Sequence, residues 1–170
     1  TGLFLSHFRP VLEQGQDLVY VAMASGISGT YQAALLAKQE LEEQFPDRCV
    51  YIIDSKGCGF GSGMLVLRAA ELSRQGLSAR EAGQILDGEV PHICQYFTVD
   101  DLNFLKRSGR VSGAAAAIGT VLNIKPILYG SADGHIVACG KVRGRKKAND
   151  TLVETYAKKQ VDAPNHQVAI

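Results

Sequence analysis

The stretch that decides the fold is LVYVAMASGISGT, residues 18–30. Residues 18–24 are almost entirely apolar, as expected for a strand that is covered on both faces. A helical pattern opens at Tyr31, so the small residues before it connect a strand to a helix. Proteins of the α/β class build anion pockets at such connections, because N–H groups point out of the helix start and the helix dipole favours negative charge there.

Five residues of this connection are candidate ligands for an anion: Ser25, Gly26, Ser28, Gly29 and Thr30. Glycines let the backbone approach a ligand closely, and the hydroxyl groups add hydrogen-bond donors. A purely structural interpretation stays open at this point, in which Ser28 caps the helix and the glycines shape the turn.

The rest of the first half repeats the alternation of strands and helices. Cys49–Ile53 predicts a second buried strand that ends at Asp54, and Ser78 with Glu81 forms a capping-box pattern. The spacing of apolar residues predicts helices over 3–14 (starting late, near Ser6, because of Pro10), 30–45, 62–75 and 78–88. The helix over 62–75 is apolar almost all round, so we expect it to be buried.

The second half changes character after Pro91. We expect a strand over 94–99, a short helix through Leu105 and an Ala-rich helix that starts at Ser112. Strands over 124–129 and 135–142 meet at an Asp-Gly turn, and a helix follows over 143–159. The sequence therefore predicts a two-lobed α/β fold, with a parallel-sheet lobe over residues 1–91 and a mixed-sheet lobe over residues 92–170.

Composition excludes several classes of function. The formal net charge is +1, and no aromatic residues are interleaved with the basic ones, which argues against a nucleic-acid binder. No apolar run approaches the roughly 20 residues that span a bilayer, so we expect no membrane anchor. The cysteines (Cys49, Cys58, Cys94 and Cys139) are scattered in apolar segments, which predicts buried free thiols in a reducing, cytoplasmic setting, and neither a zinc site nor another metal site.

Motifs for nucleotides and for hydrolysis are incomplete. The glycine-rich run over 57–63 lacks the third glycine of a dinucleotide fingerprint, and no phosphate-binding loop with Gly-Lys-Ser/Thr is present. Gly26-Ile27-Ser28-Gly29 has its second glycine one place too early for a serine-hydrolase elbow. The alternative function that stays open is an enzyme acting on a small anionic substrate, with Asp54 or Ser28 in the chemistry.

Two basic clusters lie in the second half, over residues 106–110 and 141–147. Each is either a solvated face or a site for a phosphate or another anion, since arginine forks match phosphate well.

The sequence resembles the DegV family of fatty-acid-binding proteins. The matching segments run in family order along nearly the whole chain: residues 25–34, 53–55, 61–63, 96–102, 105–112, 122–127 and 143–148. The resemblance implies a two-lobed α/β fold with a long-chain fatty acid held between the lobes. It also implies that some members serve as the acyl carrier of a bacterial fatty acid kinase and present the carboxylate to a separate ATP-binding kinase subunit.

The resemblance also implies roles for particular residues. Ser25 matches the serine that holds the fatty acid carboxylate, with Ala24 standing where the family has another serine. Arg110 and Arg143 match arginines at the contact with the kinase subunit or the acyl phosphate. The implied protein has no catalytic residues and no cofactor beyond the bound lipid. A threonine motif and C-terminal groups that complete the family's site have no counterpart within Thr1–Ile170, so we expect the chain to be a fragment. The nearly all-apolar segments 62–72 and 114–124 are candidate walls for the acyl chain.

Overall fold

The structure is a computed structural model that describes residues 1–101, 107–110, 123–161 and 168–169. The chain divides into two compact units, residues 1–93 and residues 94–170, and each is described by itself. One contains a parallel sheet and the other an antiparallel sheet, both with packed helices, so the expected α/β class is confirmed.

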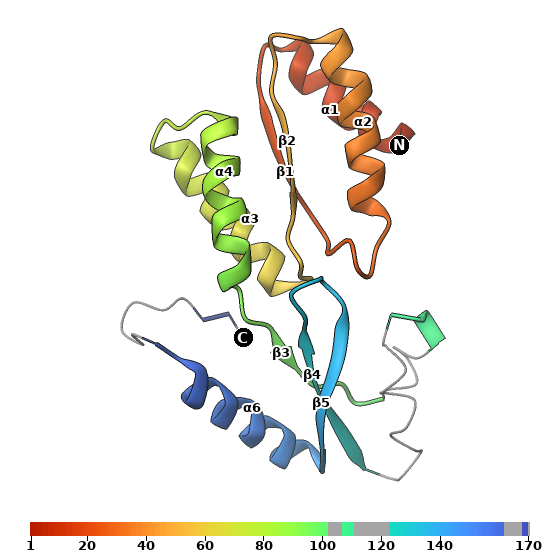
Figure 1. Ribbon diagram of the computed structural model, residues 1–170, viewed down its shortest axis with the longest axis vertical. Coiled ribbons are helices and arrows are strands. Elements are labelled where there is room, and N and C mark those ends of the chain that lie inside the picture. The colour runs from red at the N-terminus through yellow and green to blue at the C-terminus, as the bar shows by residue number, and fades with distance from the viewer. Residues whose placement is uncertain (102–106, 111–122, 162–167, 170) are drawn as a thin grey trace. The chain divides into compact units, whose positions relative to one another are not determined.

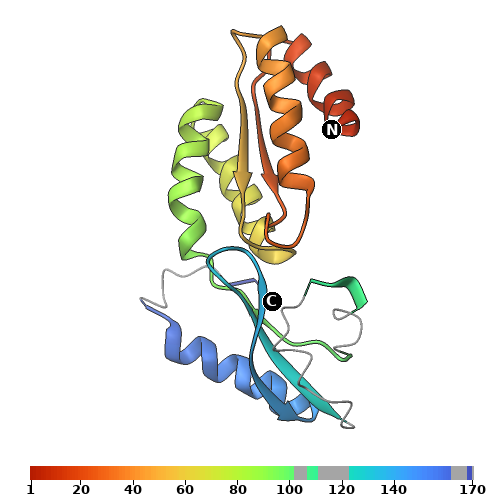
Figure 2. The ribbon, with the colours of Figure 1, turned by 45° about the vertical axis from the view of Figure 1, so that its right-hand side comes forward.

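The first unit is a three-layer α/β arrangement (Figures 1 and 2). Strands β1 (Leu18–Ala22) and β2 (Val50–Asp54) pair in parallel, with Leu18 opposite Val50 and Ala22 opposite Asp54. Helices α1 (Gly2–Glu13) and α2 (Thr30–Gln44) lie on one face of this pair. Helices α3 (Phe60–Arg74) and α4 (Ala79–Glu89) lie on the other, and the short 3₁₀ helix η1 (Val90–His92) follows.

Alternation along the strands builds a separate core on each face. Ile52 packs with Phe8, Leu12 and Leu41 on the side of α1 and α2, whereas its neighbour Ile53 packs on the side of α3 and α4. Because successive side chains of a strand point to opposite faces, both faces of β2 are buried. This burial explains why the strands are almost entirely apolar in sequence.

Helix α4 lies unusually close to β2. A Cβ atom placed on Gly83 would lie 2.3 Å from ring atoms of Tyr51, so only glycine fits there. The Tyr51 hydroxyl donates a hydrogen bond to Asp87 on the same helix at 2.7 Å. The helix begins with the predicted capping box, in which Ser78 and Glu81 bond each other's backbone N–H groups.

Two details of the helices differ from expectation. Helix α1 begins at Gly2, not near Ser6, and continues through Pro10, because the burial of Phe8 and Leu12 outweighs the lost hydrogen bond. Helix α3 is not buried all round: Leu65 and Leu72 face the core, but Leu67 is 72% exposed within the described residues. A helix on a sheet buries one face only, and the apolar sequence of α3 does not show which face that is.

The second unit contains an antiparallel sheet in the order β3-β4-β5. Its strands are β3 (Tyr96–Phe97), β4 (Ile124–Gly130) and β5 (Ile136–Arg143), and helix α6 (Arg145–Lys159) packs on β4 and β5. The rings of Tyr96 and Tyr129 stack with their centroids 5.8 Å apart. The ammonium group of Lys159 lies 5.6 Å from the Tyr96 ring centroid, which ties the end of α6 to β3.

Several expectations for this unit are corrected or lie outside the described residues. The strand expected over 94–99 is only Tyr96–Phe97, and the helices expected up to Leu105 and from Ser112 fall mostly on residues 102–106 and 111–122, which are not described. All four cysteines are free thiols, but none is fully buried: Cys49 and Cys58 are half-buried, and Cys94 and Cys139 are exposed. Cys94 precedes β3, and Cys139 lies at the irregularity between β4 and β5. Among the helices of the described residues, none combines the length and apolar character needed to cross a membrane.

Candidate functional site

The carboxyl ends of β1 and β2 bring two connections together. Residues 23–29 leave β1 toward α2, and residues 55–59 leave β2 toward α3. Because the strands are parallel, both connections emerge at the same edge, which is where α/β proteins bind ligands. The backbone N–H of Ser25 donates to Asp54 Oδ1 at 3.1 Å, and the N–H of Ala24 donates to the carbonyl of Gly57 at 2.9 Å.

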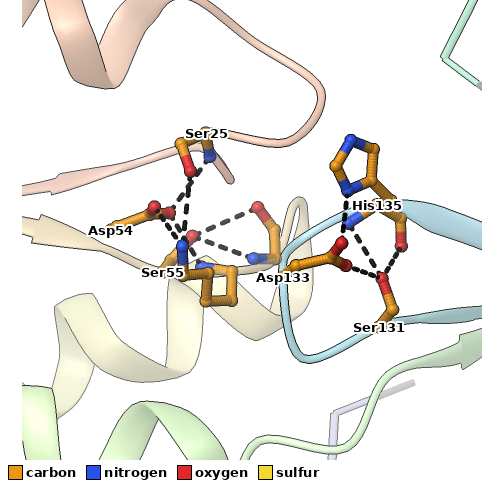
Figure 3. Close-up of polar contacts among 8 residues, drawn as sticks. Ser25, Asp54, Ser55, Ser131, Asp133 and His135 are labelled. Atoms are coloured by element: carbon orange, nitrogen blue, oxygen red, sulfur yellow. Dashed lines mark hydrogen bonds and ion pairs between the residues drawn. The ribbon is translucent and has the colours of Figure 1, made fainter.

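The Asp54 carboxylate links the two connections through hydrogen bonds, and Figure 3 shows it beside Ser25. Its Oδ2 accepts from Lys56 Nζ at 2.7 Å, and its Oδ1 accepts the backbone N–H of Lys56 at 3.2 Å in addition to that of Ser25. Burial raises the pKa of Asp54, but the hydrogen bonds from Lys56 and Ser25 outweigh burial and hold that pKa below its ordinary value of 3.8. Asp54 is therefore a stable anion that positions the loop, and it is a weak base.

The hydroxyl group of Ser25 is the exposed member of this network, and the Ser25 side chain also helps to lower the pKa of Asp54. Ser25 is exposed, and its Oγ lies 3.4 Å from Lys56 Nζ. Its own N–H is already used by Asp54, so the hydroxyl is the donor that Ser25 can offer to a ligand. This geometry matches the role that the family resemblance gives to Ser25, although the structure holds no ligand.

The remaining loop residues have mixed roles. Ser28 Oγ accepts the N–H of Thr30 at 3.2 Å and lies 3.0 Å from Thr30 Oγ1, but the N-cap of α2 is Gly29, so the structural interpretation of Ser28 as the N-cap is wrong. Ser28 stabilises the turn that leads into α2. The N–H groups of Tyr31 and Gln32, in the first turn of α2, have no acceptor among the described residues. Gly29 is exposed beside them. The helix start therefore keeps N–H groups for an anion.

The buried Ser55 side chain fixes the connection between β2 and α3, residues 55–59. It is 1% exposed, and its Oγ donates to the carbonyl of Gly57 at 3.1 Å and lies 2.9 Å from Ser62 Oγ on α3. A buried hydroxyl with these partners is structural, and it holds residues 55–59 against the start of α3.

The hairpin of the second unit contains a serine, an aspartate and a histidine in contact, which Figure 3 also shows. The Ser131 hydroxyl donates to the carbonyl of His135 at 3.0 Å and also contacts the carboxylate of Asp133, which lies 3.0 Å from His135 Nδ1. A hydrolytic triad needs histidine between serine and aspartate. Here aspartate is in the middle, so the cluster closes the turn around Gly134 and is not a nucleophile with its base.

The basic residues of the second unit divide into paired and unpaired ones. Lys125 and Arg145 both contact Asp100, and these contacts lower the pKa of Asp100, with the hydrogen bond from Arg145 as the main cause. Arg110 contacts the carbonyl of Ser108. Arg143 is exposed on β5, and its guanidinium group has no partner in the part of the chain that the structure describes.

Comparison of the sequence with known proteins shows which family the chain belongs to. The family model described as "Uncharacterised protein, DegV family" matches residues 1–170. The chain belongs to the DegV family. A DegV domain-containing protein of Clostridium perfringens is 40% identical over 164 residues, which cover 96% of this chain and 56% of that protein. A similar protein of Lactococcus lactis is 39% identical, over 91% of this chain and 53% of that protein.

Solved DegV structures share the fold. A protein of Eubacterium ventriosum, described as a stearic acid-binding protein, is 31% identical with a TM-score of 0.82, over 95% of this chain and 55% of that chain. A DegV family protein of Thermus thermophilus, described by its fatty acid binding, is 36% identical with a TM-score of 0.76, over 91% and 53% of the two chains. The chain thus spans about half the length of the relatives it matches.

The structure brings the sequence-predicted residues together only in part. Ser25, Ser28 and Thr30 lie in the first unit, where Ser25 bonds the alternative catalytic candidate Asp54 and Ser28 contacts Thr30. Arg110 and Arg143 lie in the second. Within the described residues, no group of His, Cys, Asp or Glu could hold a metal ion. Lys56 was missed by the sequence analysis, although its place directly after a buried strand and beside Asp54 was a usable signal.

Proposed function

We propose that the protein containing this chain binds a long-chain fatty acid, with the carboxylate beside Ser25 and the start of α2. The observation that supports this most is the exposed Ser25 hydroxyl next to Lys56 at the carboxyl edge of β1 and β2. Relatives that are more than 30% identical and share this fold are described as fatty-acid-binding proteins. A hydroxyl donor, free helix N–H groups and a cation suit a carboxylate.

The first unit also offers apolar surface for an acyl chain. Helix α3 starts directly after the connection that carries Lys56, and Phe60, Val66 and Leu67 are 67%, 51% and 72% exposed. Of the two segments expected to wall the acyl chain, 62–72 has exposed apolar side chains that can do so. The other segment, 114–124, falls mostly on residues 114–122, which lie outside the described residues. Apolar side chains that stay exposed in this unit are suited to cover a lipid tail.

The test is a titration of stearate into the full-length protein and its Ser25→Ala variant. We expect wild type to bind and the variant to bind about 10- to 100-fold more weakly, because a hydrogen bond to a charged group is worth about 1.5–3 kcal/mol. Ser73→Ala, at an exposed serine on α3, is the matched control and should bind like wild type. Absence of stearate binding by wild type would reject the proposal.

We further propose that the protein is a carrier without chemistry of its own, which presents the carboxylate to a separate ATP-binding kinase subunit. Because that subunit uses ATP, we propose that the protein works in the cytoplasm. The guanidinium group of Arg143 is exposed and has no partner among the residues that the structure describes, so it is suited to meet a phosphate or an acidic surface. The lowered pKa of Asp54 and the use of Ser28 Oγ by the N–H of Thr30 weigh against the alternative of an enzyme that uses either residue.

The kinase step is tested with stearate-loaded full-length protein, ATP and the candidate kinase, by measuring acyl phosphate formation. Arg143→Ala should lower the rate about tenfold or more at an unchanged stearate Kd, because a charge-assisted contact is lost. Arg74→Ala, at an exposed arginine on α3, is the control and should react like wild type. Equal rates for Arg143→Ala and wild type would remove Arg143 from this contact.

A further inference from the structure

Lys56 adopts a backbone conformation that few side chains tolerate. Its φ is 50°, in the left-handed region that favours glycine, and only one other described non-glycine residue, Asn123, has a positive φ. The Asp54 carboxylate holds Lys56 in this conformation from two sides, through its backbone N–H at 3.2 Å and its Nζ at 2.7 Å. Strained backbone of this kind gathers at functional sites, where the surrounding structure fixes a side chain in place.

The ammonium group of Lys56 is held between two groups that differ in exposure. On one side is the Asp54 carboxylate, whose side chain is only 11% exposed. On the other side is the exposed Ser25, whose Oγ lies 3.4 Å from Nζ (Figure 3 shows Ser25 and Asp54). The Lys56 side chain itself remains 36% exposed, so an ammonium group with three donors keeps capacity on the Ser25 side.

The Lys56 ammonium group can offset the repulsion between Asp54 and a bound carboxylate. A fatty acid carboxylate bound to the Ser25 hydroxyl would lie near the Asp54 anion, and like charges at such distances repel. The Ser25 N–H does not help the ligand, because it already donates to Asp54. Among the described residues, Lys56 is the cation within contact distance of both Ser25 and Asp54.

We propose that Lys56 determines head-group specificity: its ammonium group bridges Asp54 and the carboxylate of the lipid beside Ser25. This inference rests on the proposed function. The bridge cancels the Asp54 charge for a carboxylate ligand and offers no such gain to a lipid of the same chain length with an uncharged head group. Lys56 therefore selects fatty acids over fatty alcohols.

The experiment compares stearate with stearyl alcohol in the full-length protein. Lys56→Gln removes the charge while keeping a hydrogen-bonding side chain of similar length. Lys38→Gln is the matched control, because Lys38 is also partly exposed and paired, with Glu42 at 3.5 Å on α2. If Lys56→Gln does not fold, Lys56→Gly repeats the test, since glycine accepts a φ of 50° without strain.

We expect Lys56→Gln to weaken stearate binding about 10- to 100-fold and to leave stearyl alcohol binding unchanged, so that the preference for the acid shrinks by the same factor. Lys38→Gln should behave like wild type with both lipids. An equal loss for both lipids, or no loss for stearate, would overturn the role of Lys56 while leaving the proposed function intact. If wild type itself binds no stearate, both the inference and the proposed function fail.

Discussion

Asp54 places a negative charge at the edge where an anion is proposed to bind. Sequence alone made this residue a catalytic candidate because it ends a buried strand, although a carboxylate in that position more often caps a turn. In the structure, its oxygens accept from two backbone N–H groups and one ammonium group, and its pKa is lowered. At the scale of single residues, Asp54 therefore organises Ser25 and Lys56 and is a weak base.

The lowered pKa of Asp54 makes a prediction about stability and pH. A carboxyl group whose pKa is lower in the folded state stabilises the fold above its unfolded pKa, and this stabilisation is lost as the pH falls through the folded value. The contribution of Asp54 should thus be complete above its ordinary pKa of 3.8 and should decline below it. Asp54→Asn should lose about 1–3 kcal/mol of unfolding free energy at neutral pH and should depend less on pH in the acid range.

Urea unfolding of the full-length protein across the acid range measures this effect. Asp47→Asn is the control, because Asp47 is exposed in the connection between α2 and β2 and has no ion pair within the described residues. If the unfolding free energy of Asp54→Asn depends on pH in the acid range as that of wild type does, the hydrogen bonds to Asp54 do not stabilise the fold.

The sequence predicts some residues of the candidate site but not the contacts between them. Ser25 follows from the strand-to-helix pattern, because such connections expose polar groups at one sheet edge. The use of its N–H by Asp54 does not follow, because the two residues are 29 positions apart and meet only through strand pairing. The position of Lys56 directly after a buried strand was a signal in the sequence, but its strained φ and its contact with Ser25 exist only in three dimensions.

At the scale of elements, the close packing of α4 on β2 makes a second prediction. Gly83→Ala should destabilise the full-length protein by about 1–3 kcal/mol, since its Cβ would lie 2.3 Å from the Tyr51 ring and overpack the interface. Gly88→Ala on the same helix is the matched control, because a Cβ there meets no atom within 4 Å. It should be neutral or stabilising by up to about 1 kcal/mol.

Denaturant unfolding of the two glycine variants gives the comparison. A Gly83→Ala protein as stable as Gly88→Ala would mean that α4 can move away from Tyr51 without cost, against the packing described here.

The sequence predicted most helices and strands of the first unit, because β1 and β2 are short apolar runs, α2 has an apolar face and α4 begins with a capping box. It failed for α3, whose sequence is apolar on every side, so that only packing reveals Leu65 as buried and Leu67 as exposed. It also failed for the length of β3, because residues 94–99 are apolar enough for a strand but only Tyr96 and Phe97 pair with β4.

At the scale of the whole molecule, the chain carries two compact α/β units and spans about half the length of its DegV relatives. The candidate carboxylate site lies in the first unit, and the exposed Arg143 lies in the second. Family membership follows from the order of the motifs along the chain, whereas the identity of the lipid depends on the shape of the complete protein. The central claim, lipid binding, is therefore tested on the full-length protein.

The most direct measurement is mass spectrometry of lipids extracted from the purified full-length protein after expression in bacteria. We predict one long-chain fatty acid per protein molecule in wild type and a clear loss of that lipid in the Ser25→Ala variant. A wild-type protein that carries no fatty acid, and that takes up none when stearate is added, would contradict the account.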